Sequence, residues 1–112
     1  MEKFKVLVVE DNQTTQLLLV TVLRSWGYNV LATDTAEQAV DTVMRELPNI
    51  IITDWMLPGM NGPTLCEKVR KLELQHYIYM IIVTALSDVS NVVTGLEAGA
   101  DDFLRKPVNF SE

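Results

Sequence analysis

The chain has little of what several classes of protein require. It has one cysteine, Cys66, so an internal disulfide is impossible and neither a zinc site nor a disulfide framework is indicated. Its 9 Lys and Arg residues against 15 Asp and Glu give a net charge of -6, which argues against a basic face for nucleic acid or an anionic membrane. The longest apolar stretches, 17–23 and 78–86, are shorter than the roughly 20 residues of a membrane span. We expect a cytoplasmic protein that binds neither nucleic acid nor membrane directly.

What is present suits one folded domain, since 48% of the 112 residues are hydrophobic. Short apolar runs predict strands at 4–9, 29–33, 50–53, 79–83 and 100–104. Helical spacing between them predicts helices over about 17–26, 35–47, 63–72 and 87–99. This alternation predicts an α/β fold with a doubly wound parallel sheet and right-handed crossovers.

The alternation of predicted strands and helices is incomplete at the end of this sequence. Residues 108–112 resemble the lead-in to a fifth helix that is missing from this chain. We therefore expect residues 1–112 to be one domain truncated before its last helix. Apolar residues on one face of the first and fifth strands would then lack cover. The alternative is a shortened domain that forms a dimer over this gap.

Acidic residues stand where two of the predicted strands end. Glu10 and Asp11 follow the first strand, and Asp54 ends the third. The ends of parallel strands lie on one edge of the sheet, where ligands bind in such folds. Carboxylates held close together repel one another, and a hard divalent cation relieves this repulsion. We predict a magnesium site with Asp11 and Asp54 as direct ligands and Glu10 acting through water.

Two further residues suit a phosphoryl group beside this cation. Lys106 follows the fifth strand and supplies a compact positive charge, and Thr84 ends the fourth strand with a hydroxyl donor. With both drawing charge from the phosphoryl oxygens, the Asp54 carboxylate is placed to attack phosphorus and become an aspartyl phosphate. Taken singly, an acid after a strand is more often a helix cap, so the prediction depends on the combination.

Together these segments resemble the receiver domain of two-component response regulators over essentially the whole chain. The segments that carry the resemblance are Val6–Asn12, Ile52–Gly62, Val83–Ala85 and Gly99–Pro107. Their spacing agrees too, since Thr84 lies 30 positions after Asp54 and Lys106 lies 52 positions after it. The resemblance implies a flavodoxin-like sheet in the order 2-1-3-4-5.

The resemblance also implies specific roles. Asp54 would accept a phosphoryl group from a phosphohistidine, and the backbone carbonyl of Met56 would be a third protein ligand to Mg2+. Thr84, Ala85 and Lys106 would bind the phosphoryl oxygens.

The same resemblance implies a conformational switch made by Thr84 and Phe103. Phosphorylation would change the surface around the fourth helix and fifth strand. The donor would be a sensor histidine kinase or phosphotransfer protein, and an output domain or downstream protein would read the change. Such a domain regulates and is not an enzyme beyond assisting its own phosphorylation and dephosphorylation.

Three other functions compete with this interpretation. An Asp-nucleophile phosphatase needs a second acid two residues after the nucleophile, where this chain has Met56. A flavin or nucleotide binder needs a phosphate-cradling loop after the first strand, where Glu10 and Asp11 would repel phosphate. A receiver-like interaction module that is never phosphorylated stays open as the third alternative.

Overall fold

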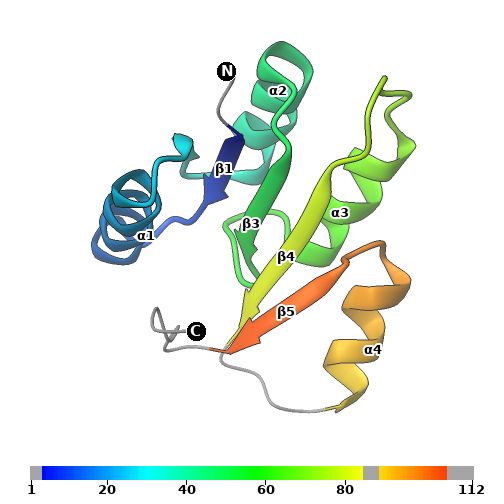
Figure 1. Cartoon of the computed structure of the whole chain (residues 1–112). Coiled ribbons are helices and arrows are strands. Elements are labelled where there is room, and N and C mark those ends of the chain that lie inside the picture. The colour runs from blue at the N-terminus through cyan, green and yellow to red at the C-terminus, as the bar shows by residue number, and fades with distance from the viewer. Residues whose placement is uncertain (1–3, 85–88, 106–112) are drawn as a thin grey trace.

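Five strands alternate with four helices in the computed structural model, which describes residues 4–84 and 89–105. The elements are β1 (Lys5–Val9), α1 (Gln13–Ser25), β2 (Asn29–Thr33), α2 (Ala36–Glu46), β3 (Ile50–Asp54), α3 (Gly62–Lys71), β4 (Tyr79–Thr84), α4 (Val89–Glu97) and β5 (Asp102–Arg105). All strand pairs are parallel and their order is β2-β1-β3-β4-β5. Figure 1 shows β1, β3, β4 and β5 side by side in this order. The predicted doubly wound fold and strand order are confirmed.

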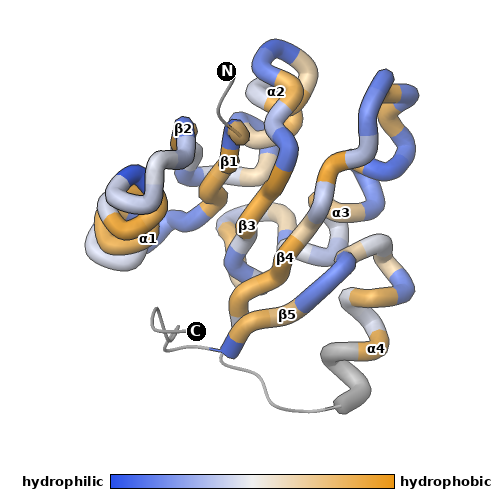
Figure 2. The backbone as a smooth tube through the Cα atoms, in the orientation of Figure 1, coloured by the Kyte–Doolittle hydropathy of each residue, from blue (hydrophilic) through white to orange (hydrophobic). Residues whose placement is uncertain are grey.

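The sheet separates two apolar cores because successive strand residues point to opposite faces. Helices α2, α3 and α4 lie on one face and α1 on the other (Figure 1). Hydrophobic residues run along the central strands β1, β3 and β4 (Figure 2). The α2–α4 side buries Leu7, Val9, Ile51, Met80 and Ile82, and the α1 side buries Val6, Val8, Ile52 and Val83. No helix in the described part of the chain is long and apolar enough to cross a membrane.

Helix α1 begins four residues earlier than the sequence predicts. The Asn12 side chain accepts a hydrogen bond from the Thr15 N–H at 2.9 Å, which satisfies a backbone donor that the first helical turn leaves open. A helix start at Gln13 follows from this cap. The predicted end near residue 26 is confirmed, since Trp26 is the C-cap and Gly27, directly after it, has a φ of 94°.

Several apolar residues whose spacing predicted the helices lie outside the buried helix faces. Leu17 and Leu18 on α1 are 68% and 52% exposed, and Met44 on α2 is 60% exposed. The buried face of α1 is instead formed by Leu19, Val20 and Leu23. Apolar spacing predicted the helices. Which side of each helix faces the sheet depends on packing contacts that this spacing does not determine.

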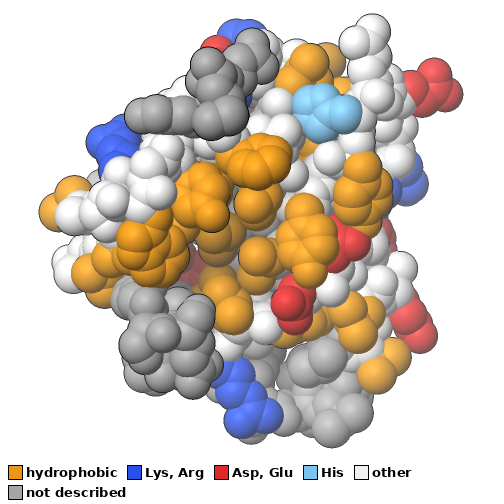
Figure 3. All heavy atoms as spheres, viewed as in Figure 1, with side chains coloured by type: hydrophobic (Ala, Val, Ile, Leu, Met, Phe, Trp, Pro, Cys, Tyr) orange, Lys and Arg blue, Asp and Glu red, His pale blue; other side chains and the backbone are white. Residues whose placement is uncertain are grey.

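The α1 side of the sheet is covered unevenly. Contrary to expectation, β1 is fully buried there, because α1 packs over Val6 and Val8. On β4 and β5, Tyr79 and Leu104 are 42% and 38% exposed. Figure 3 shows hydrophobic side chains gathered across this face. Among the described residues, the apolar surface without helix cover therefore lies toward β4 and β5.

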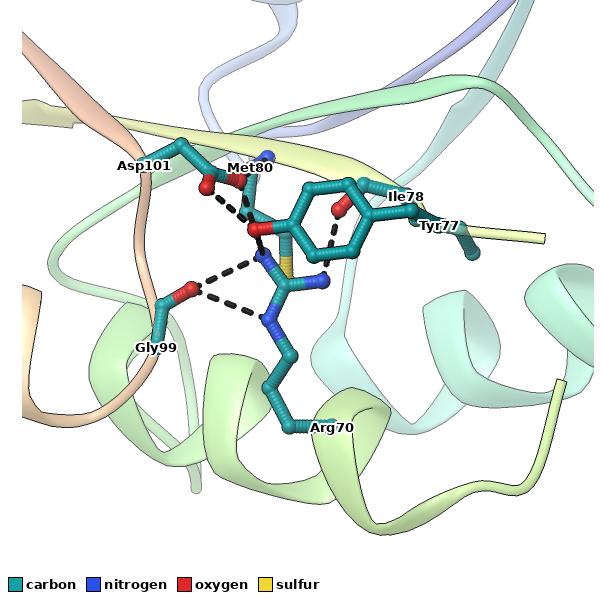
Figure 4. A network of polar contacts seen from close by, with 6 residues as sticks. All are labelled: Arg70, Tyr77, Ile78, Met80, Gly99 and Asp101. Atoms are coloured by element: carbon teal, nitrogen blue, oxygen red, sulfur yellow. Dashed lines mark hydrogen bonds and ion pairs between the residues drawn. The ribbon is translucent and has the colours of Figure 1, made fainter.

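A polar network ties α3 to the starts of β4 and β5 (Figure 4). The Arg70 guanidinium donates to the carbonyls of Gly99 and Ile78 and to Asp101 Oδ2, with the shortest of these bonds at 2.6 Å. Asp101 Oδ2 also accepts the Met80 N–H at 2.8 Å. The Asp101 N–H in turn donates to the Met80 carbonyl, and β5 begins only at the following residue. This network explains why β5 starts two residues later than predicted.

Candidate functional site

The strand register brings the predicted acids to one edge of the sheet. Val9 pairs with Thr53, so β1 and β3 end side by side, and Asp54 pairs with Val83 on β4. Glu10 and Asp11 therefore follow β1 directly beside the end of β3. All strands point the same way, so these ends lie on the edge toward which the arrows point in Figure 1.

Three carboxylates meet at this edge. Glu10, Asp11 and Asp54 each offer an oxygen, and the three oxygens all lie within 4.8 Å of one another. Glu10 is only 2% exposed, whereas Asp54 is half-buried and Asp11 is exposed. Two unit charges at this separation repel by at least roughly 3 kcal/mol at an effective dielectric constant of about 20. The cluster is therefore suited to bind a cation.

The loop after Asp54 is held close to the strand end. The Trp55 N–H donates to the Val83 carbonyl at 3.0 Å, and the Gly62 N–H closes the loop on the Trp55 carbonyl at 2.8 Å. A Cβ at Gly62 would lie 2.7 Å from the Asp54 carbonyl oxygen, which leaves no space for a side chain. Between these anchors, the Met56 side chain is 68% exposed.

The remaining predicted site residues lie toward β4 and β5. Thr84 is 3% exposed and pairs with Arg105, so it lies at the same edge as the acids. Lys106 would follow directly after that pair, but Lys106 and Ala85 lie outside the described residues. The structure thus brings together Glu10, Asp11 and Asp54, with Thr84 on the neighbouring strand.

Phe103 links β5 to the loop and to α4. Its ring centroid lies 6.2 Å from that of Trp55, the residue next to Asp54. On the other side it contacts Gly95 of α4, where an added Cβ would lie 2.2 Å from Phe103 Cζ. The aromatic side chain therefore touches both the loop at the acidic edge and the helix whose surface was predicted to change.

Sequence reasoning missed several residues that build this region. Gly62 ends the segment Ile52–Gly62, but the sequence did not indicate that its lack of a side chain permits the close approach to Asp54. Gly95 carried no signal, because its contact with Phe103 joins positions on separate elements. Gln16 donates to the carbonyl of Glu10, and a single glutamine in a polar stretch gives no warning of this.

The lone thiol takes no part in this site. Cys66 is completely buried in the core beneath α3. Burial raises the pKa of the Cys66 thiol to about 12, so it stays protonated at neutral pH. A protonated, inaccessible thiol is neither a nucleophile nor a metal ligand.

Comparison with known proteins agrees with this geometry. The profile of the response regulator receiver domain matches residues 6–112. The chain is 39% identical over 112 residues to a probable transcriptional regulator, ycf27, of Porphyridium aerugineum, covering 100% of this chain and 45% of that protein. It spans less than half the length of the curated relatives it matches.

Solved structures show the same similarity. A putative response regulator from Chloroflexus aurantiacus superposes with a TM-score of 0.92 at 36% identity, covering 98% of this chain and 90% of that one. The receiver domain of the sensor histidine kinase PA1611 from Pseudomonas aeruginosa, described with a magnesium ion coordinated in its active site cleft, has a TM-score of 0.88 at 30% identity, covering 98% and 90%. This chain belongs to the response regulator receiver domain family, the regulatory domains of two-component systems.

Proposed function

We propose that this chain is a phosphorylation-dependent switch in which Asp54 accepts a phosphoryl group in the presence of Mg2+. The observation that carries the proposal is the cluster of Glu10, Asp11 and Asp54, whose oxygens lie within 4.8 Å of one another. Carboxylate oxygens are the ligands that Mg2+ prefers, and it commonly shares them with phosphate oxygens. The magnesium described in the related PA1611 receiver domain supports the same choice of metal.

The dimensions of the cluster suit a mixed set of ligands. Two oxygens bound to one Mg2+ at 2.0–2.1 Å lie no more than about 4.2 Å apart. A spread of up to 4.8 Å fits direct binding by two carboxylates and a water bridge to the third. We assign Asp11 and Asp54 as the direct ligands, with the Met56 carbonyl, and the buried Glu10 as the bridged member. The bound cation would neutralise charge on the phosphoryl oxygens.

In the transfer itself, an Asp54 carboxylate oxygen forms a bond to phosphorus while the P–N bond of a donor phosphohistidine breaks. The leaving imidazole nitrogen keeps the electron pair of that bond. Thr84, at the adjacent strand end, would donate its hydroxyl to a phosphoryl oxygen, with Ala85 and Lys106 completing the binding site. The donor would be a sensor histidine kinase or a phosphotransfer protein. The transfer would take place in the cytoplasm.

The readout would proceed through Thr84 and Phe103 toward α4. Phe103 contacts Trp55 at the acidic edge and Gly95 on α4, so a shift of the ring changes the packing of that helix. Moving such an equilibrium from 1:99 to 99:1 takes about 5.5 kcal/mol of differential binding. Several charged hydrogen bonds to phosphoryl oxygens supply energies of this order. An attached output domain or a partner protein would recognise the changed surface, and the names of the transcriptional relatives favour an attached domain.

Trp55 provides the test of this assignment. A Trp26→Phe variant leaves Trp55 as the only tryptophan, next to the proposed phosphoacceptor. We expect its emission to change when Mg2+ is added, and again when beryllium fluoride, a phosphoryl mimic, follows. The control carries Asp54→Asn in the same background. An equal beryllium fluoride response in the control would place the site elsewhere, whereas no response in either protein would favour an unphosphorylated interaction module.

A further inference from the structure

The side-chain amide of Gln16 connects three segments at the acidic edge. From the first turns of α1, Gln16 Nε2 donates to the Glu10 carbonyl at 2.9 Å and to Asp34 Oδ1 at 2.8 Å. A longer contact of 3.3 Å reaches the Thr33 carbonyl at the end of β2. One amide thus joins α1 to the acid pair after β1 and to the loop after β2.

The Gln16 amide binds the backbone carbonyl of Glu10, so it acts on the direction of the backbone at this residue. The Glu10 N–H donates to the Thr33 carbonyl at 3.1 Å, so both peptide groups that flank Glu10 are held. The carbonyl that Gln16 holds belongs to the peptide unit between Glu10 and Asp11. Because a peptide unit is planar, fixing its carbonyl restricts the directions in which both carboxylates leave the backbone.

Asp34 anchors this arrangement from the other side. Its Oδ1 accepts from Gln13 Nε2 at 3.1 Å as well as from Gln16, and its N–H donates to Gln38 Oε1 at 3.1 Å. The Asp34 carboxylate is not among the three that converge at the site. It holds the two glutamine amides in place and is not part of the acidic cluster.

We propose that Gln16 is a positioning residue for the magnesium site, which sets the approach of Glu10 and Asp11 toward Asp54 by holding the peptide between them. The inference rests on the proposed function, because it assumes that these carboxylates bind a cation. Every partner of Gln16 Nε2 is an acceptor, so the position requires a donor. Loss of this donor frees the peptide without removing any ligand.

Gln13 offers a matched control on the same helix. Like Gln16, it donates an amide N–H to Asp34 Oδ1, but the structure shows no bond from it to the Glu10 carbonyl. Gln13→Met and Gln16→Met each remove one amide of this kind, keep the side-chain length and leave the net charge unchanged. The two variants therefore differ in whether the peptide between Glu10 and Asp11 stays held, and in the longer contact of Gln16 with the Thr33 carbonyl.

The experiment is a calorimetric titration of MgCl2 into the metal-free full chain, for the wild type and both variants. We expect Gln16→Met to raise the Kd for Mg2+ about tenfold, the lower end of the effect of removing groups that orient metal ligands. Gln13→Met should change it by less than about twofold. Unfolding by urea without Mg2+ serves as the second readout, and Gln16→Met should lose more stability than Gln13→Met, because the Gln16 amide makes more hydrogen bonds.

The outcomes separate the two proposals. A wild type that binds Mg2+ and a Gln16→Met variant that binds it equally well, although less stable, would make Gln16 merely structural and overturn the inference. A wild type that binds no Mg2+ would overturn the proposed function and this inference with it. If Gln16→Met does not fold, Gln16→Asn keeps an amide but draws it back from the Glu10 carbonyl, and the same rise in Kd is expected.

Discussion

The contact between Gly95 and Phe103 permits a sharp test of how α4 is packed. Replacing Gly95 by Ala should by itself favour the helix by about 1 kcal/mol, because glycine is a poor helix former. In this structure, however, the new Cβ would lie 2.2 Å from Phe103 Cζ and 3.1 Å from Cε1 and Cε2. The ring must move by more than about 1 Å to restore ordinary carbon contacts near 3.5 Å. Overpacking of this kind costs about 1–3 kcal/mol.

Gly95→Ala should therefore be neutral or destabilising in the natural chain. In a Phe103→Ala background the obstruction is gone, and the same substitution should stabilise by up to about 1 kcal/mol. Urea denaturation of the four proteins measures the difference, which should amount to a coupling of about 1–3 kcal/mol. Emission from Trp55, which contacts Phe103, should also shift in Gly95→Ala. Equal effects of the substitution in both backgrounds would refute the described packing.

Three further predictions concern other positions. Gly62→Ala should weaken Mg2+ binding severalfold in a calorimetric titration, because its Cβ would lie 2.7 Å from the Asp54 carbonyl, and unchanged affinity would contradict this. The pKa of Tyr77 lies above its ordinary value chiefly because its hydroxyl donates to Asp101; Asp101→Asn should lower it in an absorbance titration. Cys66 should resist thiol reagents until the chain unfolds. Since its pKa rises from 9.0 to about 12 on folding, its contribution to the free energy of unfolding should be present below pH 9 and decline as pH rises toward 12.

Much of the fold follows from features that are local in the sequence. Apolar runs located every strand, and the acids at their ends were assigned to one edge because parallel strands all end there. The predicted end of the first helix before Gly27 and the predicted start of the third at Pro63 agree with the structure to within one residue, because the backbone constraints of glycine and proline act within one turn. These signals need no knowledge of distant contacts.

What the sequence did not predict depends on contacts between distant segments. The exposure of Leu18 and Met44 follows from how each helix rotates against the sheet, which hydrophobic spacing leaves open. Gln16 and Gly95 acquire their importance from contacts with other elements, chiefly to the Glu10 carbonyl and to the Phe103 ring. The late start of β5 likewise depends on an arginine that comes from α3.

The most direct test of the central claim is the intact mass of the purified chain after incubation with acetyl phosphate. With Mg2+ present, we expect a single added phosphoryl group on the natural chain. Without Mg2+, or in the Asp54→Asn variant, we expect none. Failure of the natural chain to gain a phosphoryl group, or an equal gain by Asp54→Asn, would contradict the assignment of Asp54 as a magnesium-dependent phosphoacceptor.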